Sequence, residues 1–378
     1  MFGLGDFIDL LVYRLGATVL LDGDDIYGTL PPVVEGVWLP FTYPPFAAML
    51  FAPLALIPVE LGKLVFTLVS VAALAVTLRV VLARVWPQLE ARAAWAATAI
   101  AVAVALLLEP VRETISFGQI NMILMALVAI DVLARNPKWP RGVLIGVAAA
   151  IKLTPIGFLL LFLVKRDWRT SAHIVGGALG SSALAFVVIP DTSVKYWLHT
   201  LADTGRIGAE YFANNLSFKA VISRFGPTEQ LGSGLWVVAV AVMLVVAVMA
   251  IRRALDHDDI VMAMTANAVA ILLASPVSWS HHWVWVAPAL LALVAVVLRA
   301  PDTRTVAGAI GLGVVFLIGP HHLLPAGDDL ELDWALWQHL LGTLYVTVGL
   351  GFLVWLAFAS YRVRPQSAPP KAFSNIGG

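Results

Sequence analysis

Apolar segments long enough to cross a membrane follow one another along most of this 378-residue chain. Hydrophobic residues make up 60% of the sequence and charged residues only 13%, whereas soluble domains carry about 25% charged residues. A spanning helix needs about 20 consecutive apolar residues. The sequence therefore predicts an all-α, polytopic integral membrane protein and excludes an ordinary soluble domain.

Nine segments have the composition of full spans. They are residues 61–84, 92–109, 117–134, 171–190, 233–251, 259–275, 283–299, 304–319 and 336–359. Two further apolar segments, 44–57 and 141–164, are predicted to be re-entrant or broken. The first is short and bracketed by prolines, and the second is interrupted at residues 152–155 by Lys, Leu, Thr and Pro, because proline cannot continue the hydrogen bonds of a helix.

The distribution of positive charge predicts the topology, since cytoplasmic loops are enriched in Lys and Arg. The basic groups are Arg84 with Arg92, Arg135 with Lys138 and Arg141, Lys165 with Arg166 and Arg169, Arg252 with Arg253, Arg299 with Arg304, and Arg362 with Arg364. All of them lie on one side only if segments 44–57 and 141–164 do not cross. A full crossing by both halves of 141–164 would instead place a basic triplet outside.

With that topology the chain is a single transmembrane domain over residues 1–364. Its extracytoplasmic loops are 1–43, a turn at 110–116, 191–232, 275–282 and 320–335. The remaining residues, 365–378, are rich in Pro, Ser and Gly, and we expect a disordered cytoplasmic tail. The polar loops gather outside, so a cavity facing that side is the expected site.

Asp9 is the first candidate for chemistry, in an apolar run from Phe7 to Tyr13. A carboxylate at the membrane interface acts as a general base when it reaches an acceptor hydroxyl. The alternative is a carboxylate that only begins a helix. Tyr13, Tyr43 and Trp279 are expected either to line a sugar site or to serve as interfacial anchors.

The second candidate is the pair His281 and His282, which follows Ser275-Pro276-Val277-Ser278-Trp279. Adjacent histidines cannot face one way on a helix, so we do not expect them to share a metal. One imidazole could bind a phosphate or pass a proton; the alternative is a pair of interfacial histidines among tryptophans. A second pair, His321 and His322, has nothing distinctive around it in the sequence.

Amides and cations complete the candidates. Gln119 and Asn121, at the mouth of a span, could bind sugar hydroxyls or join helices. Lys152 either meets a lipid phosphate or extends to the membrane surface.

Asn215 with Lys219 and Arg224 could bind a sugar and a phosphate, or belong to an ordinary solvated loop. The chain has no Cys, and its only near match to an Asp-x-Asp motif, at residues 22–25, is better explained as a loop cap. We therefore predict no metal and no cofactor in the reaction.

Taken together, these segments resemble glycosyltransferase family 87 of the GT-C superfamily, the actinobacterial integral-membrane mannosyltransferases. The residues that carry the resemblance recur in order along nearly the whole chain. They are Asp9-Leu10 with Val12-Tyr13, residues 23–27, Phe41-Thr42-Tyr43-Pro44-Pro45, Gly118-Gln119-Ile120-Asn121, Lys152-Leu153-Thr154-Pro155, and Ser275-Pro276-Val277-Ser278-Trp279 with His281-His282.

The resemblance implies transfer of mannose, with inversion, from a polyprenyl-phosphate-mannose donor on the extracytoplasmic face. The acceptor would be a glycolipid or lipoglycan of the phosphatidylinositol mannoside type, joined through an α-1,2 linkage. Asp9 matches the family's catalytic base, and His281 or His282 matches its histidine signature. A protonated histidine, Lys219, Arg224 and Lys152 would hold the leaving phosphate.

The family also leads us to expect a spanning helix before the Asp-containing loop, and this chain shows none. Membrane lipids are the other expected partners, and nucleic acid is not one. Three alternatives remain: a family member that transfers another sugar, such as arabinose or glucose; a flippase or transporter of lipid-linked sugars, although no internal repeat supports it; and a structural membrane subunit.

Overall fold

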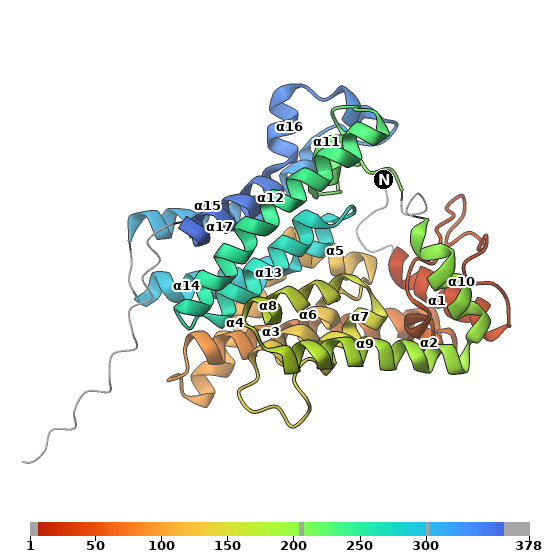
Figure 1. The fold of residues 1–378 in the computed structure, drawn as a ribbon, viewed down its shortest axis with the longest axis horizontal. Coiled ribbons are helices and arrows are strands. Elements are labelled where there is room, and N and C mark those ends of the chain that lie inside the picture. Colours follow the sequence, from red (N-terminus) through yellow and green to blue (C-terminus); the bar gives the residue numbers. More distant parts are fainter. Residues whose placement is uncertain (1–6, 204–207, 300–301, 359–378) are drawn as a thin grey trace, which may run out of the picture.

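The computed structural model describes residues 7–203, 208–299 and 302–358. Within those ranges the chain is almost entirely helical, and its β pairing is limited to isolated bridges of Val34 with Val37 and of Asn215 with Trp279. Figure 1 shows the long helices running side by side, with shorter ones at their ends. The predicted all-α class is confirmed, while the predicted tail, 365–378, lies outside the described residues.

Four helices are long and apolar enough to cross a membrane within the described ranges. They are α3 (Val59–Val85), α9 (Trp168–Val188), α12 (Glu229–Asp256), and the continuous unit of η4 (Ser280–Trp285) and α14 (Val286–Arg299). They coincide with four of the predicted spans. The protein is therefore a multi-pass membrane protein.

Two predicted spans are bent rather than straight. Helix α4 (Ala91–Ala105) meets α5 (Glu109–Phe117) at 79°, and α16 (Leu336–Gly342) meets α17 (Leu344–Phe358) at 62°. Pro110, in the first turn of α5, has no amide with which to continue the α4 ladder, and proline favours the start of a new helix. The predicted turn at 110–116 is therefore wrong, because those residues form most of α5.

The remaining apolar helices are shorter than a straight crossing requires. They are α2 (Pro45–Ala55), α6 (Asn121–Leu133), η1 (Thr154–Phe158) continued by α8 (Leu159–Val164), α13 (Ile260–Ala274) and α15 (Thr303–Ile318). By length and composition the described part thus holds four to six candidate spans, fewer than the nine predicted. The predicted break in segment 141–164 is confirmed, because α7 (Val143–Ile151) ends just before Lys152.

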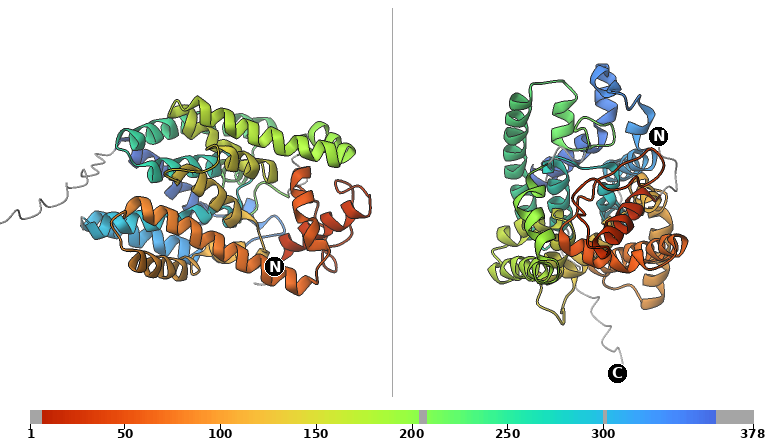
Figure 2. Two further views of the ribbon diagram at one scale, coloured as in Figure 1. Left: turned by 90° about the horizontal axis from the view of Figure 1, so that it is seen from below. Right: turned by 90° about the vertical axis from the view of Figure 1, so that its right-hand side faces the viewer.

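Several segments predicted as loops contain helices. They are α1 (Ile8–Leu21), α10 (Pro190–Leu198), η2 (Thr200–Ala202), α11 (Phe218–Ser223), η5 (Pro320–Leu323) and η6 (Leu330–Asp333). Figure 2 shows α1, α2 and α10 together beside the ends of α3 and α9. Asp9 consequently lies on a helix rather than in an open loop.

Glycines allow α7 and α9 to pack with their backbones in contact. A Cβ on Gly146 would lie 2.3 Å from the carbonyl oxygen of Ile174, and one on Gly177 would lie 2.8 Å from that of Val143. Small residues at such crossings are typical of helix packing in membranes. This close packing fixes the end of α7, from which Lys152 projects.

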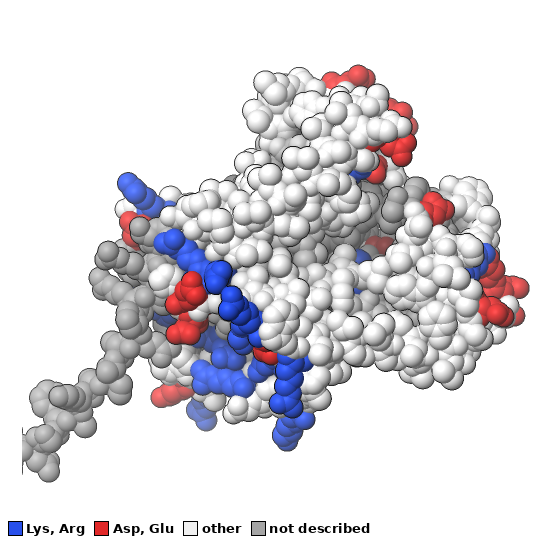
Figure 3. All heavy atoms as spheres, in the orientation of Figure 1, with Lys and Arg blue, Asp and Glu red and all other residues white. Residues whose placement is uncertain are grey.

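Positive charge is concentrated at one end of the molecule. Figure 3 shows Lys and Arg gathered at the lower left, over the end of the molecule that holds the connection between α12 and α13 and the loop between α6 and α7. There the guanidinium of Arg299 lies 5.5 Å from the Trp86 ring centroid, and Arg84 Nε donates to the carbonyl of Leu133 over 2.6 Å. For the described residues, this charge distribution agrees with the prediction from the sequence, while Arg362 and Arg364 lie outside the described residues.

Candidate active site

Asp9 lies in the first turn of α1, and a glycine brings this helix close to the end of α5. Gly118, directly after α5, has a φ of +64°, and a Cβ there would lie 2.7 Å from the Cβ of Leu10. Any larger residue would strain the backbone and push α1 away. Gly118 therefore permits the approach of Asp9 to the residues that follow it.

Gln119 organises the group around Asp9. The hydroxyls of Tyr13 and Tyr43 both donate to Gln119 Oε1, over 2.5 and 2.9 Å. The amide N–H₂ remains to donate to Asp9, with which Gln119 is hydrogen-bonded. Three of the predicted sugar-binding side chains thus surround the predicted base, and all three are buried.

The surroundings tune the acidity of Asp9, which belongs to a helix outside the candidate spans. Burial raises the pKa of its carboxyl from the ordinary value to about 6, while the positive charge of Lys152 and the Gln119 hydrogen bond act in the opposite direction. A base whose pKa lies near the working pH is well suited to accept a proton during a reaction.

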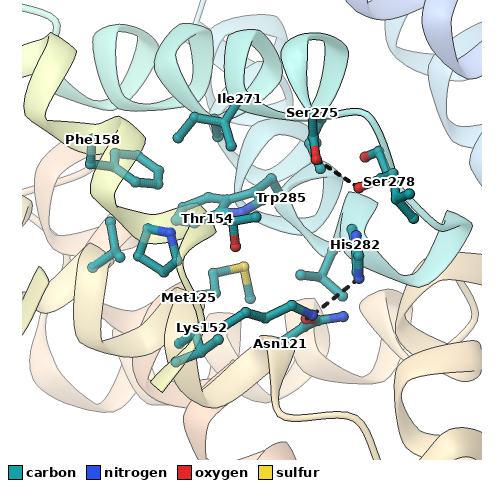
Figure 4. A pocket seen from close by; sticks show the side chains of 17 residues that line it. Asn121, Met125, Lys152, Thr154, Phe158, Ile271, Ser275, Ser278, His282 and Trp285 are labelled. Carbon is teal, nitrogen blue, oxygen red and sulfur yellow. Dashed lines mark hydrogen bonds between the residues drawn. The ribbon is translucent and has the colours of Figure 1, made fainter. Parts of the chain in front are cut away.

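Lys152 connects Asp9 to the histidines. It follows α7 with an extended backbone, and its Nζ lies 3.1 Å from Asn121 Oδ1 and 3.1 Å from His282 Nε2 (Figure 4). The same Nζ lies 5.5 Å from the Tyr43 ring centroid. Lys152, which the sequence left open between two roles, is thus the cation that the structure brings to the predicted base.

His281 and His282 lie in the 3₁₀ turn η4, with ring planes 84° apart. The carbonyl of His281 accepts from Asn121 Nδ2 over 2.8 Å and from Thr114 Oγ1 over 2.9 Å. Because an ammonium can only donate, His282 Nε2 is the acceptor of its bond with Lys152, and that ring is neutral. The sequence led us to expect that either His281 or His282 is protonated, and this hydrogen bond rules out His282 as the protonated one.

A pocket opens beside these groups (Figure 4). Its polar part is formed by Asn121, Lys152 and His282, together with Ser275 and Ser278. The rest is mostly apolar and comes from α6, η1, α13 and η4; it includes Leu124, Met125, Phe158, Ile271 and Trp285. A polar head joined to a long apolar wall suits an amphipathic lipid.

The structure gives the two other predicted phosphate-binding cations different partners. Arg224 is 1% exposed, and its guanidinium donates to the carbonyls of Tyr211, Phe212, Ala213 and Asn215. Lys219 Nζ lies 2.9 Å from Ser233 Oγ and 3.4 Å from a carboxylate oxygen of Glu210. Both side chains therefore hold the 208–233 segment together.

Asn215 also serves the structure of this loop rather than an open site. Its Oδ1 accepts from the N–H of Ser278 over 2.9 Å, and its Nδ2 donates to the carbonyls of Glu210 and Pro276. The side chain is fully buried. Trp279, predicted to line the sugar site, is half-buried beside Phe212, with ring centroids 6.4 Å apart.

A second cluster, around Glu109, was not expected from the sequence. The carboxylate of Glu109 meets His322, His321 and Tyr345, which are 212 to 236 residues further along the chain. Local sequence patterns do not reveal contacts over such separations. The only signal was the repeated His-His pair itself, which follows Gly319-Pro320.

Comparison with known proteins gives a family. Residues 41–276 match the model of glycosyltransferase family 87. These residues include Tyr43, the Gly118–Asn121 turn and Lys152, but not Asp9 or the two histidine pairs.

Curated relatives match most of the chain. A polyprenol-phosphate-mannose-dependent α-(1-2)-phosphatidylinositol mannoside mannosyltransferase of Mycolicibacterium smegmatis is 38% identical, over 93% of this chain and 82% of its own length. A phosphatidylinositol pentamannoside mannosyltransferase of Mycobacterium tuberculosis, with the same donor and linkage in its name, is 33% identical over 96% and 84%. Among solved structures, ArnT from Cupriavidus metallidurans bound to undecaprenyl phosphate aligns with a TM-score of 0.43 at 18% identity, covering 92% of this chain and 73% of ArnT.

Proposed function

Because the chain belongs to glycosyltransferase family 87, we propose that it transfers mannose from a polyprenyl-phosphate-mannose donor to a hydroxyl of a phosphatidylinositol mannoside acceptor. The protein is a membrane glycosyltransferase; its donor, acceptor and linkage are the proposed part. The names of two relatives that match over 90% of the chain support this donor, this acceptor class and an α-1,2 linkage.

The observation that carries the mechanism is the grouping of Asp9, Gln119 and Lys152 beside the pocket. The acceptor oxygen forms its bond to C1 of mannose while the bond between C1 and the phosphate oxygen breaks. Asp9 takes the proton of the acceptor hydroxyl, and the polyprenyl phosphate leaves with the bonding electrons. Attack from the face opposite the phosphate inverts a β-linked donor into an α-linked product.

Lys152 and the apolar wall suit the two parts of the donor lipid. The ammonium of Lys152 stabilises the negative charge that develops on the leaving phosphate, because charge-assisted hydrogen bonds to phosphate are strong. The apolar wall along Leu124, Phe158 and Trp285 accommodates the prenyl chain. Tyr13 and Tyr43 orient Gln119, which in turn holds the carboxylate of Asp9.

A transfer assay with the full chain tests the proposal. We expect Asp9→Asn to lower turnover by a factor of about 10²–10⁴, the usual contribution of a general base, while donor binding persists. Asp22→Asn is the matched control, because Asp22 is an exposed carboxylate at the other end of the same helix. Equal turnover in wild type and Asp9→Asn would remove Asp9 from the mechanism.

The same assay identifies the substrates. Polyprenyl-phosphate-mannose is compared with the arabinose and glucose analogues, and the linkage of the product is read by NMR. Faster transfer of another sugar would replace mannose in the proposal. If folded, donor-binding protein transferred none of the sugars, a transport function would be favoured instead.

We further propose that the Asp9 end faces the extracytoplasmic side, since the basic end lies away from it and basic loops stay in the cytoplasm. The chain contains no cysteine, so single cysteines report sidedness directly. A membrane-impermeant maleimide applied to intact cells is expected to label Asp22→Cys and not Arg166→Cys, both at exposed positions. The reverse pattern would overturn the orientation.

A further inference from the structure

The cluster around Glu109 joins the break between α4 and α5 to the turn after α15. Glu109 Oε1 lies 2.8 Å from His322 Nε2 and 3.6 Å from His321 Nε2. The three potential ligand atoms all lie within 4.8 Å of one another. The side chains of Glu109 and His321 are each 1% exposed, while that of His322 is 30% exposed and open to solvent on one side.

His321 is the member of this cluster whose position no hydrogen bond of its Nε2 explains. Its buried Nε2 has no hydrogen-bond partner among the described residues, because 3.6 Å to the carboxylate is too long. A buried polar atom normally has a partner, and leaving one unpaired costs about 1–3 kcal/mol. The carboxylate oxygen that lies 3.6 Å from this nitrogen is the same one that His322 contacts.

The other oxygen of the carboxylate is held from behind. Tyr345 on α17 donates its hydroxyl to Glu109 Oε2 over 2.7 Å. Oε1 is thereby oriented toward both imidazoles, as expected of an outer hydrogen bond that positions a metal ligand. Gly319, with a φ of +63°, begins the turn, and a Cβ there would lie 2.7 Å from Glu109 Cγ, so glycine lets η5 reach the carboxylate.

We propose that Glu109, His321 and His322 bind a Zn²⁺ ion. Two imidazoles and one carboxylate are a donor set that zinc prefers, with bonds of about 2.0–2.2 Å, which separates tetrahedral ligand atoms by roughly 3.4 Å. The observed separations, which are 2.8 Å and 3.6 Å from Glu109 Oε1 and at most 4.8 Å for any pair, need changes of no more than about 1.4 Å to reach this geometry. His322 gives up to solvent the proton it shares with Glu109, as metal binding requires, and a water molecule completes the tetrahedron.

The ion is structural rather than part of the transfer reaction. It ties η5 to the start of α5, and α5 carries Thr114, whose hydroxyl holds the carbonyl of His281. Phe117, at the other end of α5, packs edge-on against the ring of His281. Zinc at Glu109 therefore fixes the helix that supports the candidate active site, and the proposal does not depend on which sugar the enzyme transfers.

Metal analysis of the full chain in detergent tests this proposal. The protein carries a streptavidin-binding tag, because a polyhistidine tag would itself bind zinc, and it is equilibrated with micromolar Zn²⁺ and then dialysed. We expect one zinc per chain by mass spectrometry of the metal, and a tetrahedral Co²⁺ absorption spectrum after exchange. His321→Gln and Glu109→Gln are expected to lose both signals, and His282→Gln, in the other histidine pair, to keep them.

A second measurement uses wild-type protein, so it remains valid if the variants fold poorly. Wild type treated with a chelator is expected to unfold about 5 °C lower, with the difference restored by zinc but not by magnesium. Wild type that binds no zinc, or a His321→Gln,His322→Gln variant that still binds one zinc per chain, would overturn the proposal. In the first case, the Glu109–His322 pair would be a hydrogen bond only. Mannosyl transfer is measured in a separate assay, so failure of the zinc proposal and failure of the proposed function can be told apart.

Discussion

The chain carries the dipeptide His-His twice, each time in a 3₁₀ turn beyond an apolar helix, and the two copies meet opposite charges. His282 lies 3.1 Å from the ammonium of Lys152. His322 lies 2.8 Å from the carboxylate of Glu109. An identical pair in a similar local fold thus enters two kinds of chemistry, and the neighbour from a distant part of the chain decides which.

The charge next to each pair determines what its nitrogens can do. Beside Lys152, the ring nitrogen of His282 accepts a hydrogen bond, and no carboxylate pairs with either ring among the residues that the structure describes. Beside Glu109, burial lowers the pKa of His321, whereas at His322 the hydrogen bond and charge of Glu109 outweigh burial and raise the pKa. The first pair suits an incoming anion, and the second suits a cation.

Removing the positive charge of Lys152 should have the largest effect on this contrast between the two histidine pairs. We expect Lys152→Gln to lower turnover by a factor of about 10²–10³, since that is the loss on deleting a donor that stabilises developing negative charge. Lys152→Arg keeps the charge and should recover part of the activity. The measurement is single-turnover transfer at saturating donor, with thermal unfolding to verify the fold.

Lys152→Gln with wild-type turnover would show that the positive charge beside His282 has no part in catalysis. The contrast between the two histidine pairs would then be structural only. Arg224→Gln is a useful comparison, because it should lower stability rather than act on the leaving phosphate: Nε and Nη2 of Arg224 donate to backbone carbonyls.

The sequence predicted the Lys152 region better than the Glu109 region for a physical reason. Lys152, Thr154 and Pro155 interrupt an apolar segment within four residues, and both the break and its polar end were therefore predictable. The contact of Glu109 with His322 depends on the 79° bend after α4 and on a turn more than 200 residues later. No local pattern encodes such a meeting.

The same distinction explains the remaining differences. Asp9, Tyr13, Tyr43 and Gln119 were named from local patterns, and the structure brings them together. Lys219 and Arg224 were named because cations near amides suggest an anion site. A sequence does not show that backbone carbonyls or a nearby carboxylate occupy such cations, and the helical state of α1 was missed because its 14 residues are shorter than a span.

The pH dependence of transfer distinguishes the role of Asp9 from that of the Glu109 cluster, although the expected effect is smaller. Asp9 acts as a base only when ionised, and its pKa is raised to about 6. Activity should therefore be level above this value and fall about tenfold per pH unit below it. Lys152 is the charged group that faces Asp9, so Lys152→Gln should shift the acidic limb to higher pH.

The pH profile of His322→Gln should have its acidic limb at the same pH as wild type if the Glu109 cluster is separate from the catalytic base. Added zinc should not restore activity at low pH, because the loss there comes from protonation of Asp9. Protons also compete with zinc for its ligands at low pH, so the zinc concentration must be high enough to keep the site filled. A limb that moved with His322 would mean that the two histidine pairs form one titrating unit.

The smallest expected effects come from exchanging one histidine of each pair. His282→Gln should lower turnover by about tenfold, the value of one hydrogen bond to a charged group, with the unfolding temperature unchanged. His322→Gln should do the reverse, lowering the unfolding temperature by about 5 °C and changing turnover less. Each variant is the control for the other, because both remove one imidazole from a 3₁₀ turn. If both variants lost activity without losing stability, Glu109 would have to act on the reaction through α5, and its cluster would belong to the active site rather than to its support.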